Sequence, residues 1–301
     1  MDLSKVNRYE ELSFAQWVAV GNKLGGLSNV KMVLHGELDI ETRKAVKLLF
    51  DSTGRRIPEG LPVGVCDANR SLRLNQPELE QDVDYANRIT RLHECLGVDT
   101  GITAEQFKAE TERLLALIWD NSQIANIANG VWLPVILPKL TTNDIGETLE
   151  QYLEAVGKSY VKTFSDRRFY NYRKGMLVDN INIIDGSCHD QLIERMKQGP
   201  VMGINFPNPL QGFSINASRE QISTLPEGFI LSGMDTLIAM AMYPDVLARD
   251  WNTPGLDLAA FSWRSAYSLI FGASALKLDF DSTAYLAYAR DSCSGGLLFL
   301  G

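Results

Sequence analysis

Hydrophobic side chains recur at helical spacing through the middle of the chain and at shorter, alternating spacing after residue 164. The middle segment predicts helices at 77–96, 104–119, 121–128 and 142–164, the second of them opened by a capping box of Thr103 and Gln106. The later segment predicts strands at 178–184, 201–206 and 228–231 and helices at 188–198, 218–224 and 236–243. We therefore place a domain boundary near residue 160.

The first 57 residues carry weaker patterns. Residues 8–20 predict a helix, and the alternation of Val30, Met32 and Leu34 predicts a strand over residues 30–40. The sequence Asp51-Ser52-Thr53-Gly54 is typical of a turn, because these residue types bond to their own backbone or tolerate positive φ. We expect a hairpin around it.

The last 38 residues, 264–301, alternate most regularly, with apolar side chains at every second position of residues 269–273 and 276–280. This pattern predicts two strands, each with one buried face and one free face. We expect Leu269, Phe271, Leu278, Phe280 and Leu298 to be buried. The fourteen positions that we expect on the exposed side are Tyr267, Ile270, Gly272, Ser274, Ala275, Asp279, Asp281, Ala284, Tyr285, Ala287, Tyr288, Arg290, Ser292 and Cys293.

The composition of this tail differs from that of the rest of the chain. Lys, Glu, Gln, Met and Trp number 51 in residues 1–263, a rate at which 38 residues would hold about seven, but the tail holds only Lys277. No codon that ends in C encodes any of these five amino acids. Rewriting the outward positions at codons of that type would remove them in this way.

A regular frame with variable positions, closing the chain on Ser294-Gly295-Gly296-Leu297-Leu298-Phe299-Leu300-Gly301, resembles the variable proteins of diversity-generating retroelements. In that family, which includes proteins of candidate-phylum bacteria, adenine-directed mutagenesis varies a C-terminal ligand-binding surface on a C-type-lectin-like fold. The resemblance implies an α+β protein. A mixed, mainly helical N-terminal domain of unknown role (1–160) would precede a C-type-lectin-like domain of the formylglycine-generating-enzyme subclass (161–301). It also implies that the fourteen outward positions, in a variable region of about 264–301, bind a ligand without catalysing a reaction.

Charge and hydropathy narrow the range of partners. The net charge is −8 and no cluster of four or more Lys or Arg residues occurs, which argues against nucleic acid and anionic membranes as partners. The most apolar run, 131–138, is too short to cross a bilayer. The N-terminus lacks the pattern of a signal peptide, so we expect a cytoplasmic protein, with export by another route left open. The expected partner is a protein or another macromolecule, and the oligomeric state is open.

Motifs for metal, cofactor or covalent chemistry are weak. His35, His93 and His189 stand apart from one another and from any cysteine pair, so we expect surface or capping histidines and no metal site. Cys188 and His189 are adjacent on a predicted helix and point apart, so we do not expect cysteine catalysis. We also expect no cofactor. Two alternatives remain open. One is an enzyme that uses acids with Arg167, Arg168 or Arg173 in a pocket between two domains, and the other is a structural or oligomerisation protein.

Overall fold

The computed structural model describes residues 12–41, 45–60, 63–74 and 83–301. Contacts within the chain divide it into two units, residues 1–46 and residues 47–301. The boundary that the sequence suggested near residue 160 therefore falls inside the second unit. Residues 8–11 and 77–82 of two predicted helices lie outside the described residues.

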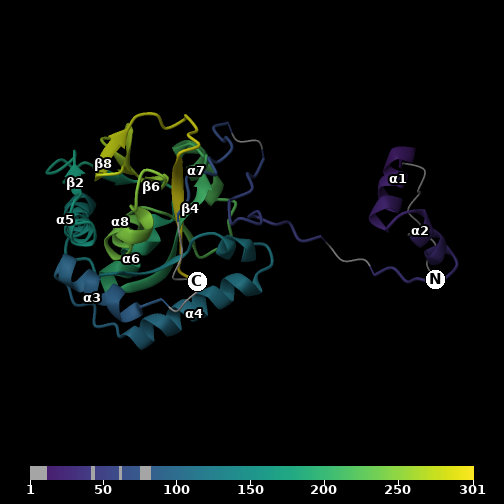
Figure 1. Cartoon of the computed structure of the whole chain (residues 1–301), viewed down its shortest axis with the longest axis horizontal. Helices are drawn as coiled ribbons and strands as arrows, with labels where there is room; N and C mark the ends of the chain where they lie inside the picture. Colours follow the sequence, from purple (N-terminus) through teal and green to yellow (C-terminus); the bar gives the residue numbers. More distant parts are fainter. Residues whose placement is uncertain (1–11, 42–44, 61–62, 75–82) are drawn as a thin grey trace. The chain divides into compact units, whose positions relative to one another are not determined.

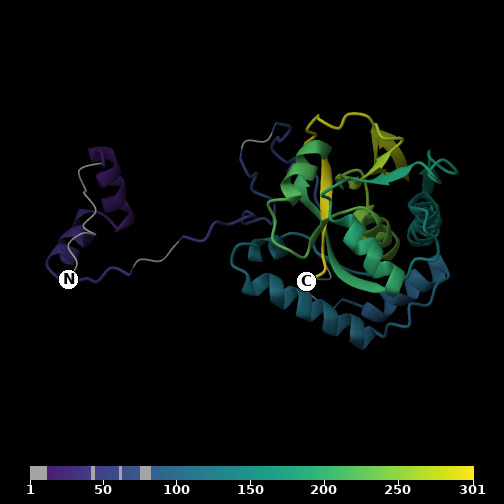
Figure 2. The ribbon, with the colours of Figure 1, turned by 180° about the vertical axis from the view of Figure 1, so that it is seen from behind.

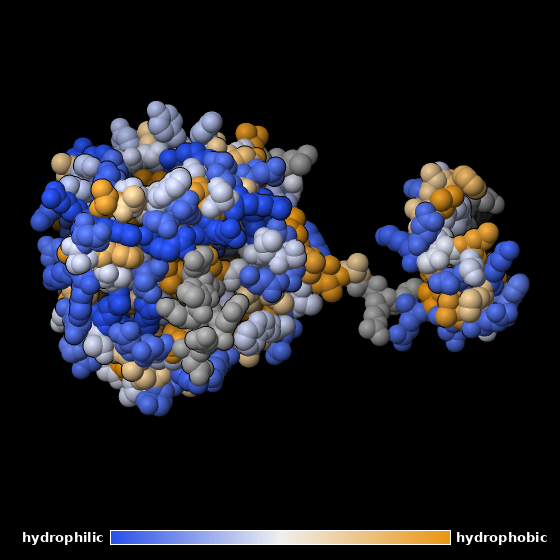
Figure 3. Space-filling view, in the orientation of Figure 1, coloured by the Kyte–Doolittle hydropathy of each residue, from blue (hydrophilic) through white to orange (hydrophobic). Residues whose placement is uncertain are grey.

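The first unit contains two short helices, α1 (Phe14–Lys23) and α2 (Leu27–Leu34). Ser13 and Gln16 form a capping box at the start of α1, in agreement with the helix expected there. The strand expected at 30–40 is wrong, because Leu27, Val30 and Leu34 also fit helical spacing and a short apolar run is compatible with either period. Neither helix has a buried residue, and apolar side chains are visible on the surface of this unit in Figure 3.

The second unit is built on a mixed sheet with the strand order β1-β4-β9-β6-β7-β8-β2, to which β3 adds beside β6 and β5 beside β9. Its strands are β1 (Leu133–Leu137), β2 (Arg168–Asn171), β3 (Ile181–Ile183), β4 (Val201–Gln211), β5 (Phe229–Leu231), β6 (Gly255–Trp263), β7 (Tyr267–Ala273), β8 (Lys277–Thr283) and β9 (Cys293–Phe299). The chain therefore has an α+β fold, with the C-terminal strand β9 in the interior of the sheet.

The helices of the second unit are α3 (Tyr85–Leu96), α4 (Ala104–Asp120), the 3-10 helix η3 (Ala125–Asn129), α5 (Ile145–Thr163), α6 (His189–Gln198), α7 (Ile215–Ile222), α8 (Met234–Met242) and α9 (Pro244–Leu247). All residues of α8 are buried, and this helix packs on β1, β4 and α5. Figures 1 and 2 show α3 and α4 along one side of the unit and the loop between β8 and β9 on the opposite side. Among the described residues, no helix is long and apolar enough to span a membrane.

Two neighbouring glycines allow β9 to pass between helices on both faces of the sheet. A Cβ atom on Gly295 would lie 3.0 Å from Oγ of Ser218 in α7, and one on Gly296 would lie 2.7 Å from Oγ of Ser232, just before α8. Successive residues of a strand point to opposite faces, so α7 and the start of α8 lie on opposite sides of β9. Both faces of β9 are therefore covered, one by α7 and the other by the start of α8.

Local sequence signals account for the helix ends. The capping box of Thr103 and Gln106 begins α4 as predicted, and Gly97, with φ of 76°, ends α3 in the left-handed conformation. Helix α5 ends at Thr163 as expected within a residue, but its cap is Asp144, which accepts a hydrogen bond from the Glu147 N–H. We predicted no element for β1, which is buried along its whole length.

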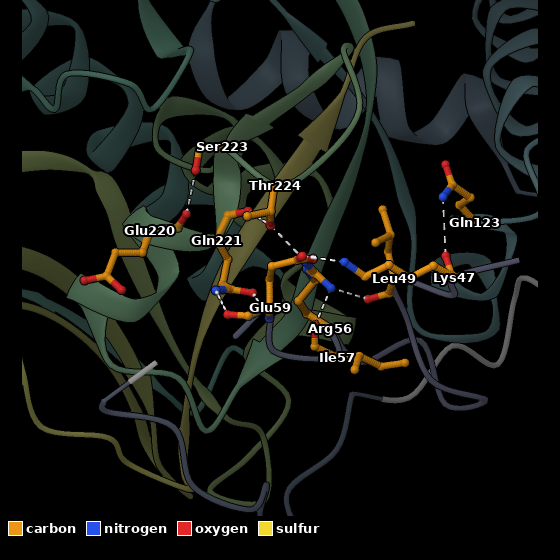
Figure 4. A network of polar contacts seen from close by, with 10 residues as sticks. All are labelled: Lys47, Leu49, Arg56, Ile57, Glu59, Gln123, Glu220, Gln221, Ser223 and Thr224. Carbon is orange, nitrogen blue, oxygen red and sulfur yellow. Dashed lines mark hydrogen bonds and ion pairs between the residues drawn. The ribbon is translucent and has the colours of Figure 1, made fainter. Parts of the chain in front are cut away.

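The hairpin predicted around Asp51 is present, with Phe50 bridged to Arg56. Arg56 is only 2% exposed, and its guanidinium donates hydrogen bonds of 2.8 Å to the Leu49 carbonyl and to Oγ1 of Thr224, just after α7 (Figure 4). The Glu59 N–H donates to Oε1 of Gln221 in α7 at 2.8 Å. These contacts fix the hairpin against α7. Further along the chain, residues 63–74 contact the loop between β8 and β9.

Candidate functional site

The outward face of β7 and β8 carries the predicted variable positions. In the antiparallel register Ile270 lies opposite Asp281, and Gly272 lies opposite Asp279, and all four are partly exposed. Their neighbours Leu269, Phe271, Leu278 and Phe280 point to the other face and are at most 1% exposed. The predicted buried frame is confirmed for this hairpin, and Leu298 is also fully buried. The outward face is partly exposed at these four positions, but Ser268 and Thr283, which pair with each other on the same face, are buried.

The loop between β8 and β9, residues 284–292, supplies the most exposed aromatic side chains of the tail. Tyr285 is 72% exposed and Tyr288 is 69% exposed, with Ala284 and Ala287 exposed beside them. The loop is fixed through its backbone, because the Asn216 N–H donates to the Leu286 carbonyl at 2.9 Å and the Asn69 N–H donates to the Asp291 carbonyl at 3.1 Å. The two tyrosines therefore stand on a loop that the body of the protein holds.

Two tail positions differ from the expectation. Cys293 was expected on the exposed side but is only 6% exposed, because it is the first residue of β9 and pairs with Gly255 inside the sheet. Leu276 was expected in the apolar frame but is 67% exposed. It lies in the turn between β7 and β8, which the Ser274 N–H closes by donating to the Lys277 carbonyl at 2.8 Å. The side chain is therefore outside the ladder that defines the two faces.

The remaining outward positions are accessible to different degrees. Tyr267 is 37% exposed and lies at the start of β7, where its ring is 5.4 Å from that of Trp263. Ala275 is exposed at the β7–β8 turn and Ser274 is half-buried. Arg290 and Ser292 are half-buried at the end of the loop. Thirteen of the fourteen positions are thus at least partly exposed.

Strand β2 and the residue that follows it add two tyrosines that we did not predict, Tyr170 and Tyr172. The strand runs parallel to β8, and its Tyr170 lies opposite Asp279. The rings of Tyr170 and Tyr172 stack with centroids 6.2 Å apart, and Nζ of Lys277 is 5.7 Å from the Tyr170 centroid. Tyr170 and Tyr172 are 38% and 50% exposed, so they extend the outward face of β7 and β8. The alternation of Tyr170, Asn171 and Tyr172 was the available signal, but it is short.

Arg290 links the loop to the sheet. Its Nη2 lies 3.5 Å from Oδ1 of Asp257, which is only 3% exposed and pairs with Ile270 across β6 and β7. Arg219 of α7 lies near the same carboxylate and donates to the Ala259 carbonyl at 2.9 Å. Burial raises the pKa of Asp257 to about 7 against the opposing effect of the two arginines, and burial raises the pKa of the neighbouring Cys293 thiol to about 11. The loop and the strand face are therefore joined through one buried carboxylate.

We expect the stability of the protein to depend on the titration of Asp257. A carboxyl whose pKa is higher in the folded state favours folding when protonated, so its contribution is present at pH 4 and is lost as the pH rises to about 7. Each pKa unit corresponds to about 1.4 kcal/mol. Denaturant unfolding of the protein and of Asp257→Asn between pH 4 and pH 8 measures the effect. The difference between the two free energies should change across this range, and a constant difference would contradict the prediction.

The other candidate residues take part in separate contacts. Arg173 forms an ion pair with Asp281 and lies over the Trp263 ring at 4.8 Å, whereas the Arg167 guanidinium lies over Phe164 at 4.1 Å. Arg168 is exposed on β2. Within the described residues, no group of three or more His, Cys, Asp or Glu side chains could hold a metal ion.

The expectation for the histidines holds for two of the three. His35 and His93 are exposed, but His189 is fully buried, which corrects the expectation of a surface or capping histidine. Its Nδ1 lies 3.2 Å from the Leu231 carbonyl, and its Nε2 accepts a hydrogen bond of 3.4 Å from the Met234 N–H. Burial lowers the pKa of His189. The ring is a satisfied neutral part of the core.

Comparison of the chain with protein-family models, with curated proteins and with solved structures gives no match.

Proposed function

We propose that the protein is a non-enzymatic binding protein whose recognition surface consists of the outward face of β7 and β8 together with the loop 284–292. The observation that carries this proposal is that a compositionally distinct tail has accessible positions on one side of a buried frame. Tyr285 and Tyr288 provide large exposed aromatic surface, and the other outward positions of the tail are mainly Ser, Gly, Ala and Asp. Tyrosine with small polar residues is typical of surfaces that bind proteins in varied ways.

The scaffold suits a surface that changes in sequence. Alternate positions of a strand lie on opposite faces, so an outward residue can be replaced without altering the buried residues Phe271, Leu278 and Phe280. A preorganised surface also avoids much of the entropy that a disordered loop loses when it binds. We therefore propose that a retroelement diversifies the tail, that residues 161–301 are related to the C-type-lectin-like fold, and that the ligand is a protein or another macromolecule.

Variants of the tail should differ in what they bind. We expect proteins that differ only at the outward positions to give different binding profiles against one panel of proteins, because interface energy is concentrated in a few aromatic and Arg residues. For any ligand found, replacing Tyr285 and Tyr288 by Ser should weaken binding at least tenfold, measured by calorimetry. Trp119→Ser is the matched control, since Trp119 is 56% exposed on α4. Identical profiles across the tail variants would contradict the proposal.

The two alternatives have less support. The enzyme alternative requires a pocket between two domains that meet near residue 160. Residues 47–301 form one compact unit, so there is no boundary between units at that position. A structural or oligomerisation role is compatible with the exposed apolar side chains of α1 and α2, such as Phe14 and Leu34, which are 84% and 77% exposed.

A further inference from the structure

Strand β2 is the last strand of the sheet and leaves one side of its backbone open. Its inner side pairs with β8, where the Arg168 N–H donates to the Leu276 carbonyl at 3.1 Å and the Tyr172 N–H donates to the Phe280 carbonyl at 3.0 Å. Successive backbone groups of a strand point to opposite sides, so those of Phe169 and Asn171 point away from β8. Among the described residues no strand pairs with this side. The other end of the sheet, β1, is buried throughout.

A cavity of about 340 Å³ lies directly beside this edge, between β2 and α5. Its apolar part is formed by Leu153 and Phe169. Gly157 keeps the helix close to the strand, because a Cβ atom at that position would lie only 2.8 Å from Cδ1 of Phe169. The cavity is on the face opposite Tyr170, since Phe169 and Tyr170 are successive residues of the strand. It is large enough for one apolar side chain.

Two lysines beside the cavity are available to an acidic side chain of a ligand. Oε1 of Glu150 already accepts hydrogen bonds from the Met176 and Leu177 N–H groups, at 3.1 and 3.2 Å. Lys158 and Lys174 also line the cavity, and within the described residues no ion pair is formed by either of them. Glu150 and Glu154 keep their negative charges, so the place proposed for an acidic side chain depends on these two ammonium groups and not on an excess of positive charge.

We propose that the open edge of β2 binds an extended peptide segment of a partner protein as an additional strand. One apolar side chain of the peptide occupies the cavity beside Phe169, and an acidic side chain on the same side of the peptide lies near Lys158 and Lys174. The backbone groups of Phe169 and Asn171 supply the hydrogen bonds, which is the usual mode of strand addition to a sheet edge. The alternate side chains of the peptide lie beside Tyr170 and Tyr172. This site is separate from the loop 284–292 and does not require that the tail be diversified.

A pair of substitutions at one residue isolates the backbone contribution. Asn171→Pro removes the outward N–H and places a ring on the open edge, whereas Asn171→Ala keeps the N–H. Both lose the hydrogen bond of 2.9 Å that the Asn171 side chain accepts from the Arg173 N–H, so they differ mainly at the edge. Proline is tolerated in an edge strand when its nitrogen faces away from the neighbouring strand. A thermal melt of each variant checks that both fold.

The probe is a displayed library of random nine-residue peptides, selected on the full chain. We expect enriched peptides to alternate and to contain an apolar residue with an acidic residue two positions away. A synthetic copy of an enriched peptide should bind Asn171→Ala within about twofold of the original protein and Asn171→Pro at least tenfold more weakly by fluorescence anisotropy. Lys158→Glu combined with Lys174→Glu, which changes only lining side chains, should shift the selection to basic peptides.

Several outcomes would overturn the proposal. These are no enrichment, enriched peptides without alternation, or equal binding to Asn171→Pro and Asn171→Ala. A dimer of the free protein that Asn171→Pro abolishes would assign the edge to a second copy of the chain instead. The double variant Tyr285→Ser with Tyr288→Ser should bind the peptide as the original protein does. The peptide experiment therefore tests the β2 edge alone, and its result is independent of whether the tail binds a ligand.

Discussion

Replacing Phe280 or Leu298 by Ala is expected to lower the free energy of unfolding by about 2–5 kcal/mol, because each change leaves a cavity in a packed core. Both side chains are fully buried, and the Phe280 ring lies 4.9 Å from that of Phe271. Replacing Tyr285 or Tyr288 by Ser should change the same free energy by less than about 0.5 kcal/mol, because these side chains are exposed. Urea unfolding monitored by circular dichroism measures all four variants.

Leu276 gives this series an internal control. By sequence it belongs to the apolar frame, but it is 67% exposed at the turn between β7 and β8. We therefore expect Leu276→Ala to behave like the tyrosine variants and not like Phe280→Ala. Equal losses in the buried and exposed classes, or a loss at Leu276 as large as that at Phe280, would contradict the arrangement of faces.

The parts of the fold that sequence predicted are those that local patterns specify. Alternation over 269–273 and 276–280 defines β7 and β8, since a strand with one buried face carries that pattern in its own residues. The capping box of Thr103 and Gln106 defines the start of α4, and Gly97 defines the end of α3, for the same reason. The start of α3 at Tyr85, where Asp84 is the cap, was not predicted, because the sequence placed it at Pro77. Strand β1 was not predicted either, because it is buried on both faces and reads as a continuous apolar run, which a helix can equally produce.

The part of the candidate site that the sequence did not predict depends on pairing between distant segments of the chain. Tyr170 and Tyr172 join the outward face only because β2 pairs with β8, more than 100 residues later in the chain. The contact between Asp257 and Arg290 likewise depends on how the loop returns across β6. Cys293 was misplaced for a related reason, since the end of the loop, and not the residue type, decides where β9 begins. Sequence periodicity shows which face a residue occupies, but it does not show which strand lies next to it.

Asp235→Ala is expected to destabilise the protein by about 3–5 kcal/mol, because it removes the shared acceptor of several buried donors, and each buried donor left unsatisfied costs about 1–3 kcal/mol. The Asp235 carboxylate is fully buried and accepts hydrogen bonds from Oγ of Ser232 and Nδ2 of Asn205, both at 2.6 Å, and from the Gly233 N–H at 2.7 Å. Without it, the Ser232 hydroxyl and the Gly233 N–H lose their acceptor, and Nδ2 of Asn205 keeps only a hydrogen bond of 3.5 Å to Oγ of Ser232. Asp235→Asn keeps the shape and one oxygen and should cost less, and Asp185→Ala, at an exposed aspartate, should have little effect.

The effect of Asp235→Ala should extend to the strand that completes the tail. The Ser232 N–H donates to the Gly296 carbonyl of β9 at 3.0 Å, so the cluster holds the strand that follows the loop 284–292. Hydrogen exchange should therefore be faster at the β9 amides in Asp235→Ala than in Asp235→Asn. If the ligand surface depends on a rigid frame, Asp235→Ala should also lower ligand affinity more than Asp235→Asn does. This effect would be indirect, because Asp235 is buried and cannot touch a ligand. Unchanged exchange in β9 together with a large loss of stability would show that the cluster supports the core without holding the tail.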